Sequence, residues 1–449
     1  MFLKPLALNS LAALALAALA PSVTQAATPS LACHIGAYRL SDGVPVVISS
    51  SGEDALRYRF LDGRSGRLFP AADGSFESGP GWSSRTPVQL RARFGDCKAG
   101  TIRLDAREGH RIVQPVTPIR FHSGAEELYG ELHLPEGGKP KAIVVLQYGS
   151  GRESAVANNF VQHLLPLKGI GVFVFDKRGT GRSTGGYTAD FKVLAADMSA
   201  ALQAIRARPE AARTPIGLMG ESQGGWVAPL AAELSPVDFV VVSYGLAIAP
   251  SEEDHQEMLQ VLKANGFGPD AVAKAEAIQK VTSQVFDSSF VHGLDELERL
   301  KALYGGEPWF KAGLGGDYTG PLTATPADQL GPVREALNFA IDLNYDPAPT
   351  LRATGDTPSL WVLAGLDTEA PSATSLEILR RLQAEGARID IAVFPNADHG
   401  IIEVADPKSG DLAGTHAPGY FDLLSDWIVH RRLDQPFGEA VNYPRTSRR

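Results

Sequence analysis

Short, almost continuous apolar runs recur along the chain after residue 140. They read "KAIVVLQYG", "GVFVFDKRG", "PIGLMGES", "DFVVVSYG", "SLWVLAG" and "IDIAVFPNA". Runs of this kind are typical of strands that are buried on both faces of a parallel sheet. Stretches with apolar residues at helical spacing separate them, such as "FKVLAADMSAALQAIRARPEA" and "ATSLEILRRLQAEG". Strands that alternate with helices predict the α/β class with a mostly parallel sheet.

One long segment interrupts this alternation. Residues 247–350 contain helical patterns and no comparable buried strand. Because open α/β sheets carry their sites at the carboxyl ends of the strands, an insertion there is expected to form a helical cap over the site. The alternative is additional helical packing at the rim of the sheet.

The region before the α/β pattern has a different character. Residues 27–114 alternate short β-prone runs with Asp-Gly turns at Asp42-Gly43, Asp62-Gly63 and Asp73-Gly74. Asp-Gly between alternating runs is a strong hairpin signal. The pattern therefore predicts a small β domain, with a structural or oligomerising role as the simplest expectation.

The first residues resemble an export signal. Lys4 precedes the apolar stretch "LALNSLAALALAALA", and small residues surround a cleavage point after Ala26. The stretch is too short for a membrane span, so residues 1–26 are predicted to be a signal peptide rather than an uncleaved anchor. No stable membrane span is expected in the mature chain, which would be periplasmic or secreted. In an oxidising compartment the two cysteines, Cys33 and Cys97, are expected to form a disulfide within the β domain.

Composition and charge exclude several classes of protein. The 449 residues are 44% apolar and 21% charged, with a formal net charge of −9, so a nucleic-acid partner is not expected. The glycines of "DKRGTGRSTG" have neither the P-loop nor the dinucleotide spacing, and no H-E-x-x-H motif is present. No cofactor and no metal site is therefore expected.

The chain contains two Gly-x-Ser-x-Gly matches, centred on Ser183 and Ser222. Because 46 residues are glycine, such a match can arise by chance, and its surroundings must decide its meaning. A nucleophile needs a strand that ends abruptly, a turn too tight for side chains at the flanking positions, and a helix that begins at once. Ser222 lies between the strand "IGLM" and the helical "GWVAPLAAEL", whereas several polar and glycine residues surround Ser183. We therefore predict Ser222 as the nucleophile and Ser183 as a loop residue.

A serine nucleophile needs a base, which an acid orients. For this arrangement the expected chain order is Ser, then acid, then His. His399 follows the strand "IDIAVFP" and is the predicted base, and Asp367 follows the strand "SLWVLAG" and is the predicted acid. Glu369 is the second choice of acid, and Asp398 is a weaker one. The other histidines after Ser222 are less suitable by position, namely His255, His292, His416 and His430.

Two backbone amides are expected to stabilise the oxyanion. One is the N–H of Gln223, which follows the nucleophile. The other is expected in the glycine-rich loop after "KAIVVLQ", with Ser150 as the first choice and Gly149 or Gly151 as alternatives. These assignments complete the predicted site.

Taken in order, "YGSGRES", "DKRGTGRSTG", "GESQGG", "AGLDTEAP" and "NADHG" resemble the α/β-hydrolase superfamily. More narrowly, they are similar to bacterial serine hydrolases of the serine-aminopeptidase, lysophospholipase and esterase type. The resemblance implies an α/β-hydrolase domain over residues 115–434, with residues 247–350 as its cap and 435–449 as a C-terminal tail. This chain has Tyr148 and Glu221 where relatives usually have histidine, and both changes touch the expected pocket wall.

Three functions are compatible with these patterns. The first is an exported serine hydrolase that cleaves small carboxylic esters through an acyl-enzyme. The second keeps this chemistry but acts on short peptides, with Glu252, Glu253 and Asp254 as ligands for a free α-ammonium group. The simpler interpretation of these acids is a capping box formed by Ser251 and Asp254. The third is a binding protein that has lost its activity, and the intact Ser, Asp and His set argues against it.

Overall fold

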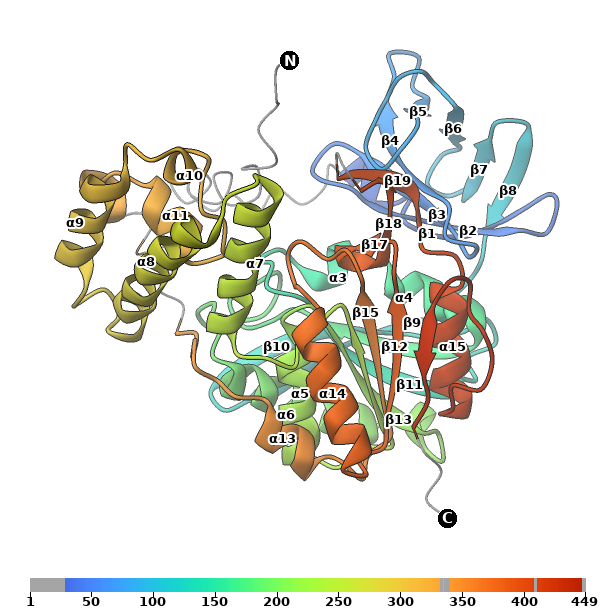
Figure 1. Ribbon diagram of the computed structural model, residues 1–449. Coiled ribbons are helices and arrows are strands. Elements are labelled where there is room, and N and C mark those ends of the chain that lie inside the picture. The colour runs from blue at the N-terminus through green and yellow to red at the C-terminus, as the bar shows by residue number, and fades with distance from the viewer. Residues whose placement is uncertain (1–28, 332–333, 335–339, 408–409, 446–449) are drawn as a thin grey trace.

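The computed structural model describes residues 29–331, 334, 340–407 and 410–445 (Figure 1). The predicted signal peptide, residues 1–26, lies outside the described residues. In the described part, a barrel of short strands precedes a large sheet covered by helices, and a group of helices follows strand β14 (Phe239–Ser243).

The large sheet has nine strands in the order β20-β16-β15-β14-β13-β11-β12-β10-β9. The six strands from β16 to β12 in this order run parallel, and β10, β9 and β20 are antiparallel to their neighbours. Their bounds are β9 Val116–Ser123, β10 Glu126–His133, β11 Ala142–Gln147, β12 Ile170–Phe175, β13 Ile216–Glu221, β14 Phe239–Ser243, β15 Ser359–Ala364, β16 Ile389–Phe394 and β20 Val441–Tyr443. Strand β20 falls in the segment that the sequence pattern assigned to a tail.

Helices cover both faces of this sheet, which explains why its central strands are apolar throughout. One face packs against α5 (Phe191–Arg206), α6 (Gly224–Leu234), α13 (Ala348–Ala353) and α14 (Ala373–Ala384). The other packs against α3 (Ala155–Asn158), α4 (Val161–Leu164) and α15 (Tyr420–His430). The carboxyl ends of the parallel strands are left to the loops that carry the candidate site.

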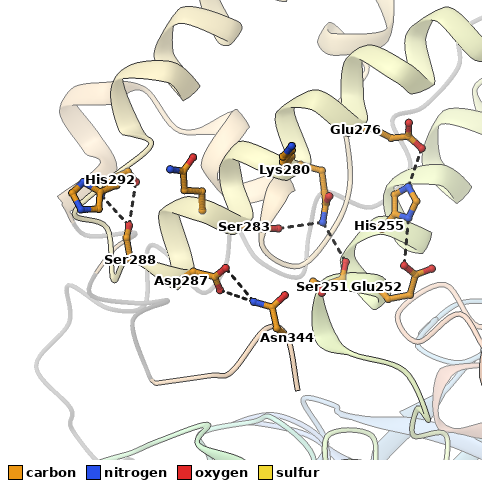
Figure 2. Close-up of a pocket in the computed structure, with 12 residues that line it drawn as sticks. Ser251, Glu252, His255, Glu276, Lys280, Ser283, Asp287, Ser288, His292 and Asn344 are labelled. Carbon is orange, nitrogen blue, oxygen red and sulfur yellow. Dashed lines mark hydrogen bonds and ion pairs between the residues drawn. The ribbon is translucent and has the colours of Figure 1, made fainter. Parts of the chain in front are cut away.

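A separate group of helices lies between β14 and β15. It contains α7 (Pro250–Ala264), α8 (Pro269–Asp287), α9 (Leu294–Tyr304), α10 (Pro308–Lys311) and α11 (Thr319–Ala324), and no strand in the described part of residues 247–350. Its apolar core is its own, with Met258, Ile278 and Leu297 fully buried. An open cavity of about 950 Å³ lies between α7 and α8 (Figure 2).

The N-terminal domain is a closed antiparallel barrel of eight strands. The three predicted Asp-Gly turns join β1 to β2, β3 to β4, and β4 to β5, and β8 pairs with β1 to close the barrel. The prediction of a small β domain is therefore confirmed. The strand bounds are β1 Gly36–Leu40, β2 Pro45–Ser50, β3 Leu56–Phe60, β4 Ser65–Pro70, β5 Phe76–Ser78, β6 Leu90–Phe94, β7 Thr101–Leu104 and β8 Arg107–Arg111.

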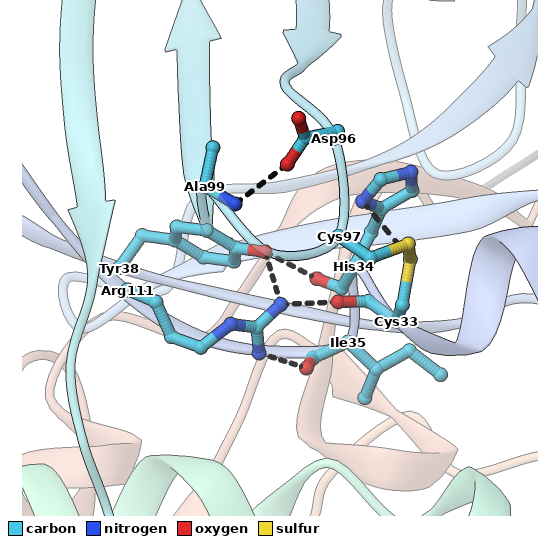
Figure 3. The surroundings of a disulfide bond; sticks show 8 residues. All are labelled: Cys33, His34, Ile35, Tyr38, Asp96, Cys97, Ala99 and Arg111. Carbon is cyan, nitrogen blue, oxygen red and sulfur yellow. Dashed lines mark hydrogen bonds between the residues drawn. A yellow bond between two sulfur atoms is a disulfide. The ribbon is translucent and has the colours of Figure 1, made fainter.

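A disulfide between Cys33 and Cys97 joins the chain before β1 to the loop between β6 and β7, as predicted (Figure 3). Beside it, the Arg111 guanidinium donates to the carbonyl groups of Cys33 and Ile35 and to the Tyr38 hydroxyl. The bridge and Arg111 together hold residues 33–35 on the barrel.

A small sheet connects the two parts of the molecule. It consists of β17 (Ala397–Asp398), β18 (Ile402–Asp406) and β19 (Asp411–His416), and it follows β16 directly. Arg64 of the barrel forms a β-bridge with Thr415, and the His416 amide donates to the Gly63 carbonyl at 2.9 Å. In Figure 1 this sheet lies under the barrel, at the same end of the large sheet as the helices after β14. Within the described residues, no helix has the length and apolar content needed to cross a membrane.

Candidate active site

A sharp turn after β13 carries Ser222. Strand β13 ends at Glu221, and α6 begins at Gly224. Ser222 has a φ of +52°, a left-handed conformation that an L-residue keeps only when its surroundings enforce it. Its side chain is partly exposed, whereas its neighbours Glu221 and Gln223 are buried. The turn therefore leaves one hydroxyl accessible at the carboxyl edge of the sheet.

Close backbone contacts explain the two flanking glycines. A Cβ at Gly220 would lie 2.0 Å from the carbonyl oxygen of Gly224, and a Cβ at Gly224 would lie 2.9 Å from that of Gln147. Because the obstructing atoms belong to the backbone, no change of rotamer relieves the clash. Any side chain at these two positions would force the turn open.

Ser183 lies in the loop between β12 and α5, as predicted. Its hydroxyl donates to the Asp176 carbonyl at 2.7 Å and accepts from the Tyr129 amide at 2.9 Å. The Asp176 carboxylate accepts in turn from the Ser154 hydroxyl at 2.7 Å and from the Arg182 amide at 2.9 Å. This second serine therefore braces a loop against β10.

His399 and Asp367 meet at the carboxyl ends of β16 and β15. The Nδ1 atom of His399 lies 3.1 Å from both carboxylate oxygens of Asp367. Asp367 is buried, and its Oδ1 also accepts from the amides of Glu369 at 3.1 Å and Ala370 at 2.7 Å. A carboxylate that accepts at Nδ1 fixes the tautomer with hydrogen on Nδ1 and leaves Nε2 as the acceptor.

The end of β14 and the residue after it, Ser243 and Tyr244, connect Ser222 to His399. The Ser222 amide donates to the Ser243 carbonyl at 3.1 Å, and the next ring, Tyr244, packs edge-on against His399 with centroids 5.0 Å apart. Among the described residues, the Ser222 hydroxyl makes no hydrogen bond to His399. The Nε2 atom of His399 lies 3.8 Å from a carboxylate oxygen of Glu369. The structure thus joins His399 directly to Asp367 and brings Ser222 to the same edge.

The charges around His399 change its titration. Burial lowers the pKa of His399, but the carboxylates of Asp367, Glu369 and Asp398 raise it by more. The net result is a pKa of about 9. The Asp398 carboxylate accepts from the amide and hydroxyl of Thr368. Of the three acids weighed from the sequence, only Asp367 accepts a hydrogen bond from His399.

The loop after β11 lies directly against Ser222. A Cβ at Gly149 would be 3.3 Å from the Ser222 Cβ. Two side chains hold the carbonyl groups of this loop: Lys177 donates to Gly149 at 2.5 Å, and Tyr187 donates to Ser150 at 2.6 Å. Because a trans peptide points its N–H opposite to its C=O, pinning the Gly149 carbonyl orients the Ser150 N–H the other way. In the described structure the amides of Gly149, Ser150 and Gln223 donate to no protein acceptor.

The other four histidines that follow Ser222 have different surroundings. His255 lies between Glu252 and Glu276, and His292 lines the same cavity between α7 and α8, which does not include the candidate residues (Figure 2). His430 ends α15, and His416 is buried where β19 meets the barrel.

The acids near the start of α7 differ from the expected capping box. Helix α7 begins after Ala249 without a side-chain cap, so the predicted Ser251–Asp254 box is wrong. Asp254 instead accepts from the amides of Tyr318 and Thr319 at 2.8 and 2.9 Å, because its carboxylate caps the start of α11. This contact lies 64 residues away along the chain, and no local pattern indicates it.

Sequence reasoning also missed a buried carboxylate below the nucleophile. Glu221 is 2% exposed and accepts from Asn159 at 2.7 Å and from the Tyr244 hydroxyl. Burial raises the pKa of Glu221 to about 7, although Asn159, Tyr244 and Arg59 each lower it. The sequence showed that Glu221 replaces a histidine that relatives usually have. It did not indicate which residues would form hydrogen bonds with Glu221.

Part of this chain is similar to a described protein family. Residues 138–289 match the family described as serine aminopeptidase, S33. The resemblance to the α/β-hydrolase superfamily is confirmed. A curated relative, protein phosphatase methylesterase 1 of Candida albicans, is 34% identical to this chain over 104 residues. That match spans 23% of this chain and only 28% of the length of the relative.

Solved structures with a similar arrangement are more distant in sequence. An esterase of Pyrococcus furiosus is 16% identical, with 64% of this chain and 84% of that chain covered and a TM-score of 0.40. An acylaminoacyl peptidase of Pyrococcus horikoshii is also 16% identical, with 85% and 55% covered and a TM-score of 0.42.

Proposed function

We propose that this chain is an exported serine hydrolase that cleaves carboxylic esters through an acyl-enzyme. The observation that carries the proposal is the strained turn at Ser222, at the same sheet edge as the hydrogen-bonded pair of His399 and Asp367. Nucleophilic serine catalysis requires this combination of an accessible hydroxyl, a nearby imidazole and an orienting carboxylate.

In the proposed reaction, the Ser222 hydroxyl attacks the ester carbonyl carbon while His399 Nε2 takes its proton. The carbonyl π bond breaks, and the negative charge moves to oxygen. His399 then gives the proton to the leaving alcohol as the ester C–O bond breaks, which leaves an acyl-serine. Water, activated by the same imidazole, releases the acid and restores Ser222. Hydrogen bonds of catalytic bases are often long without substrate and shorten when it binds.

We further propose that the amides of Gln223 and of Ser150 or Gly149 stabilise the oxyanion. Gln223 lies at the start of α6, where the first N–H groups have no partner within the helix. The fixed carbonyl groups of the opposite loop hold its amides in one orientation, which favours charge stabilisation without rearrangement.

The helices after β14, within residues 247–350, serve in this proposal as a cap over the active site. The Gln260 side chain of α7 donates to the Asp367 carbonyl at 3.3 Å, and that of Gln256 donates to the Thr374 hydroxyl at 2.7 Å. These helices are therefore attached to the loop that carries the acid and to α14. The proposed boundaries are 27–114 for the β domain and 115–434 for the α/β-hydrolase domain. The disulfide supports export.

A second candidate function is a peptidase for short peptides with a free amino end. Glu253 on α7 is 8% exposed, and the structure gives its carboxylate no hydrogen-bond partner within the described residues. Burial raises the pKa of Glu253, and the negative charges of Asp317 and Asp367 raise it further. A substrate ammonium would relieve this repulsion, which favours a cationic group next to the site.

One set of assays tests both functions. The purified mature protein is treated with a serine-reactive phosphonate probe and then compared on p-nitrophenyl esters and aminoacyl anilides. Labelling that disappears in Ser222→Ala, with faster turnover of the esters, is expected. Failure of the wild type to be labelled, or equal labelling of Ser222→Ala, would discard the serine mechanism. Faster turnover of the anilides, lost in Glu253→Gln, would support the peptidase instead.

A further inference from the structure

The backbone directly after His399 is strained. Gly400 has a φ of +74° and Ile401 a φ of +55°. A positive φ is a marked outlier for a β-branched residue, and such strain persists only when neighbouring contacts enforce it. The direction of the His399 side chain depends on this backbone, so whatever holds residues 400 and 401 also sets the imidazole.

Two hydrogen bonds from the end of β19 hold these residues. The Ile401 carbonyl accepts from the Ala417 amide at 2.9 Å. The Gly400 carbonyl lies 3.2 Å from Nδ1 of the buried His416. Because a carbonyl only accepts, the His416 hydrogen is on Nδ1, and its Nε2 is free to accept.

The donor to this Nε2 comes from the barrel. Arg59 on β3 donates its Nε–H to His416 Nε2 at 3.3 Å, across 357 positions of sequence. The same guanidinium lies over the Phe160 ring at 3.9 Å and donates to the Ser49 hydroxyl at 2.6 Å. Burial and the positive charge of Arg59 hold the pKa of His416 well below its usual value, so the ring is neutral.

Arg59 belongs to the outer surface of the barrel. On β3 the side chains of Leu56 and Phe60 fill the barrel interior, so the alternating Arg57 and Arg59 point out of it. The charged and titratable groups that interact with Arg59 include Arg57, His416, Glu221, Tyr148 and Tyr244. Three of these, Glu221, Tyr148 and Tyr244, belong to the surroundings of the candidate nucleophile.

The barrel also contacts this segment through its backbone. A Cβ at Gly63 would lie 2.4 Å from the His416 carbonyl oxygen, so the β3–β4 turn reaches β19 without any side chain between them. Trp82 of the barrel packs edge-on against the His416 ring with centroids 5.2 Å apart. His416 is therefore enclosed by both domains.

We propose that the N-terminal barrel is a positioning element of the active site, in which Arg59 acts through His416 on the Gly400 carbonyl and so sets the orientation of His399. The proposal rests on the proposed function for the role of His399. Arg59 and His416 do not touch the substrate here, and they act only through the backbone of the base.

The sharpest test uses two substitutions of His416 that separate its nitrogen atoms. His416→Asn keeps a donor close to the position of Nδ1, whereas His416→Gln keeps a polar group close to Nε2 and loses the donor to Gly400. We expect His416→Gln to lower kcat by about 10- to 100-fold, because small misplacements of a catalytic group have effects of this size, with KM changed less than about threefold. His416→Asn should retain most of kcat.

Two arginine variants on one strand provide a matched pair. Arg59→Met removes the donor to His416. Arg57→Met removes an equally outward guanidinium that donates to the Trp82 carbonyl at 2.9 Å and not to His416. Both are expected to lower the melting temperature, but only Arg59→Met should lower kcat and shift the pH at which kcat/KM rises.

Hydrogen exchange of the peptide covering residues 397–404 gives a measurement that does not depend on activity. It should exchange faster in His416→Gln and Arg59→Met than in His416→Asn and Arg57→Met. Equal exchange and equal kcat across the four variants would overturn the positioning role. If Arg59→Met fails to fold, the His416 pair decides. An inactive wild type whose exchange still follows this order would refute the serine hydrolase and support only the structural link from Arg59 through His416 to Gly400.

Discussion

The two Gly-x-Ser-x-Gly turns share their spacing and differ in almost everything else. At Ser222 the chain passes from strand to helix within two residues, and backbone atoms exclude any side chain at Gly220 and Gly224. Ser183 lies in a long loop, and its hydroxyl forms hydrogen bonds that attach this loop to β10. The glycines of the motif are therefore important because they permit close backbone contacts. Where these contacts are missing, the same motif forms a loop with a structural serine.

The largest difference is expected between the two serines themselves. Ser222→Ala should lower kcat by about 10⁵- to 10⁶-fold, because the nucleophile is lost. Ser183→Ala should leave kcat within about twofold and lower the free energy of unfolding by about 1 kcal/mol, since the Tyr129 amide loses its acceptor. Ester hydrolysis and urea unfolding of both variants measure this. A large loss of kcat in Ser183→Ala alone would reverse the assignment.

The acids that accompany the two serines give the next largest contrast. Asp367→Asn should lower kcat by about 10⁴-fold, because an amide at this position favours the wrong imidazole tautomer. The two Asp176 oxygens accept from the Ser154 hydroxyl and from the Arg182 amide, and Asp176→Asn replaces one of them by an NH2 donor. This change should lower stability while kcat stays within about threefold. Steady-state kinetics beside thermal unfolding separates the two effects. Similar kcat values for both variants would contradict the role of Asp367.

The second turn also contributes indirectly, through the buried Lys177. Burial lowers the pKa of this lysine to about 7, with Glu153 raising it and Arg152 lowering it. Lys177→Met should lower kcat about tenfold, less than the loss of an oxyanion donor itself, because the Gly149 carbonyl is no longer held. Its neighbour Arg178, which pairs with Asp197, serves as the control. Equal kcat values for Lys177→Met and Arg178→Met would contradict the role of Lys177 in holding the oxyanion loop.

The smallest expected effect concerns pH. The base must be neutral to accept a proton, so kcat/KM should rise with pH with an apparent pKa of about 9. Glu369→Gln removes a negative charge that raises the pKa of His399. The rise should therefore move to lower pH, by less than about one unit because the glutamate is 67% exposed. A pH–rate profile of both proteins measures the shift, and movement to higher pH would contradict the assignment.

Local patterns were sufficient for the elements that carry the candidate site. The apolar runs marked the parallel strands, and the ends of β13, β15 and β16 indicated Ser222, Asp367 and His399 in chain order. The Asp-Gly turns predicted the hairpins of the N-terminal domain, but its closure depends on pairing between β1 and β8, which no local signal specifies.

The remaining features depend on contacts between distant segments. Arg59 and His416 are 357 residues apart, and each taken alone is an ordinary polar residue near a strand end. The sequence around Asp254 suggested a local helix cap. Its partners in the structure, the amides of Tyr318 and Thr319, lie three helices further along the chain, so no local pattern indicates them. Periodicity and motifs describe one segment at a time, so they do not reveal side chains shared between domains.

Strand β20 has a consequence for solubility. It pairs antiparallel with β16, and the Arg445 amide that follows it donates to the buried Asp390 carboxylate at 2.7 Å. Without these few residues, β16 would offer a row of unpaired amide and carbonyl groups on an apolar strand, which is a template for aggregation. A tag or truncation that displaces residues 441–445 is therefore expected to lower the yield of soluble protein more than the activity of the protein that remains soluble.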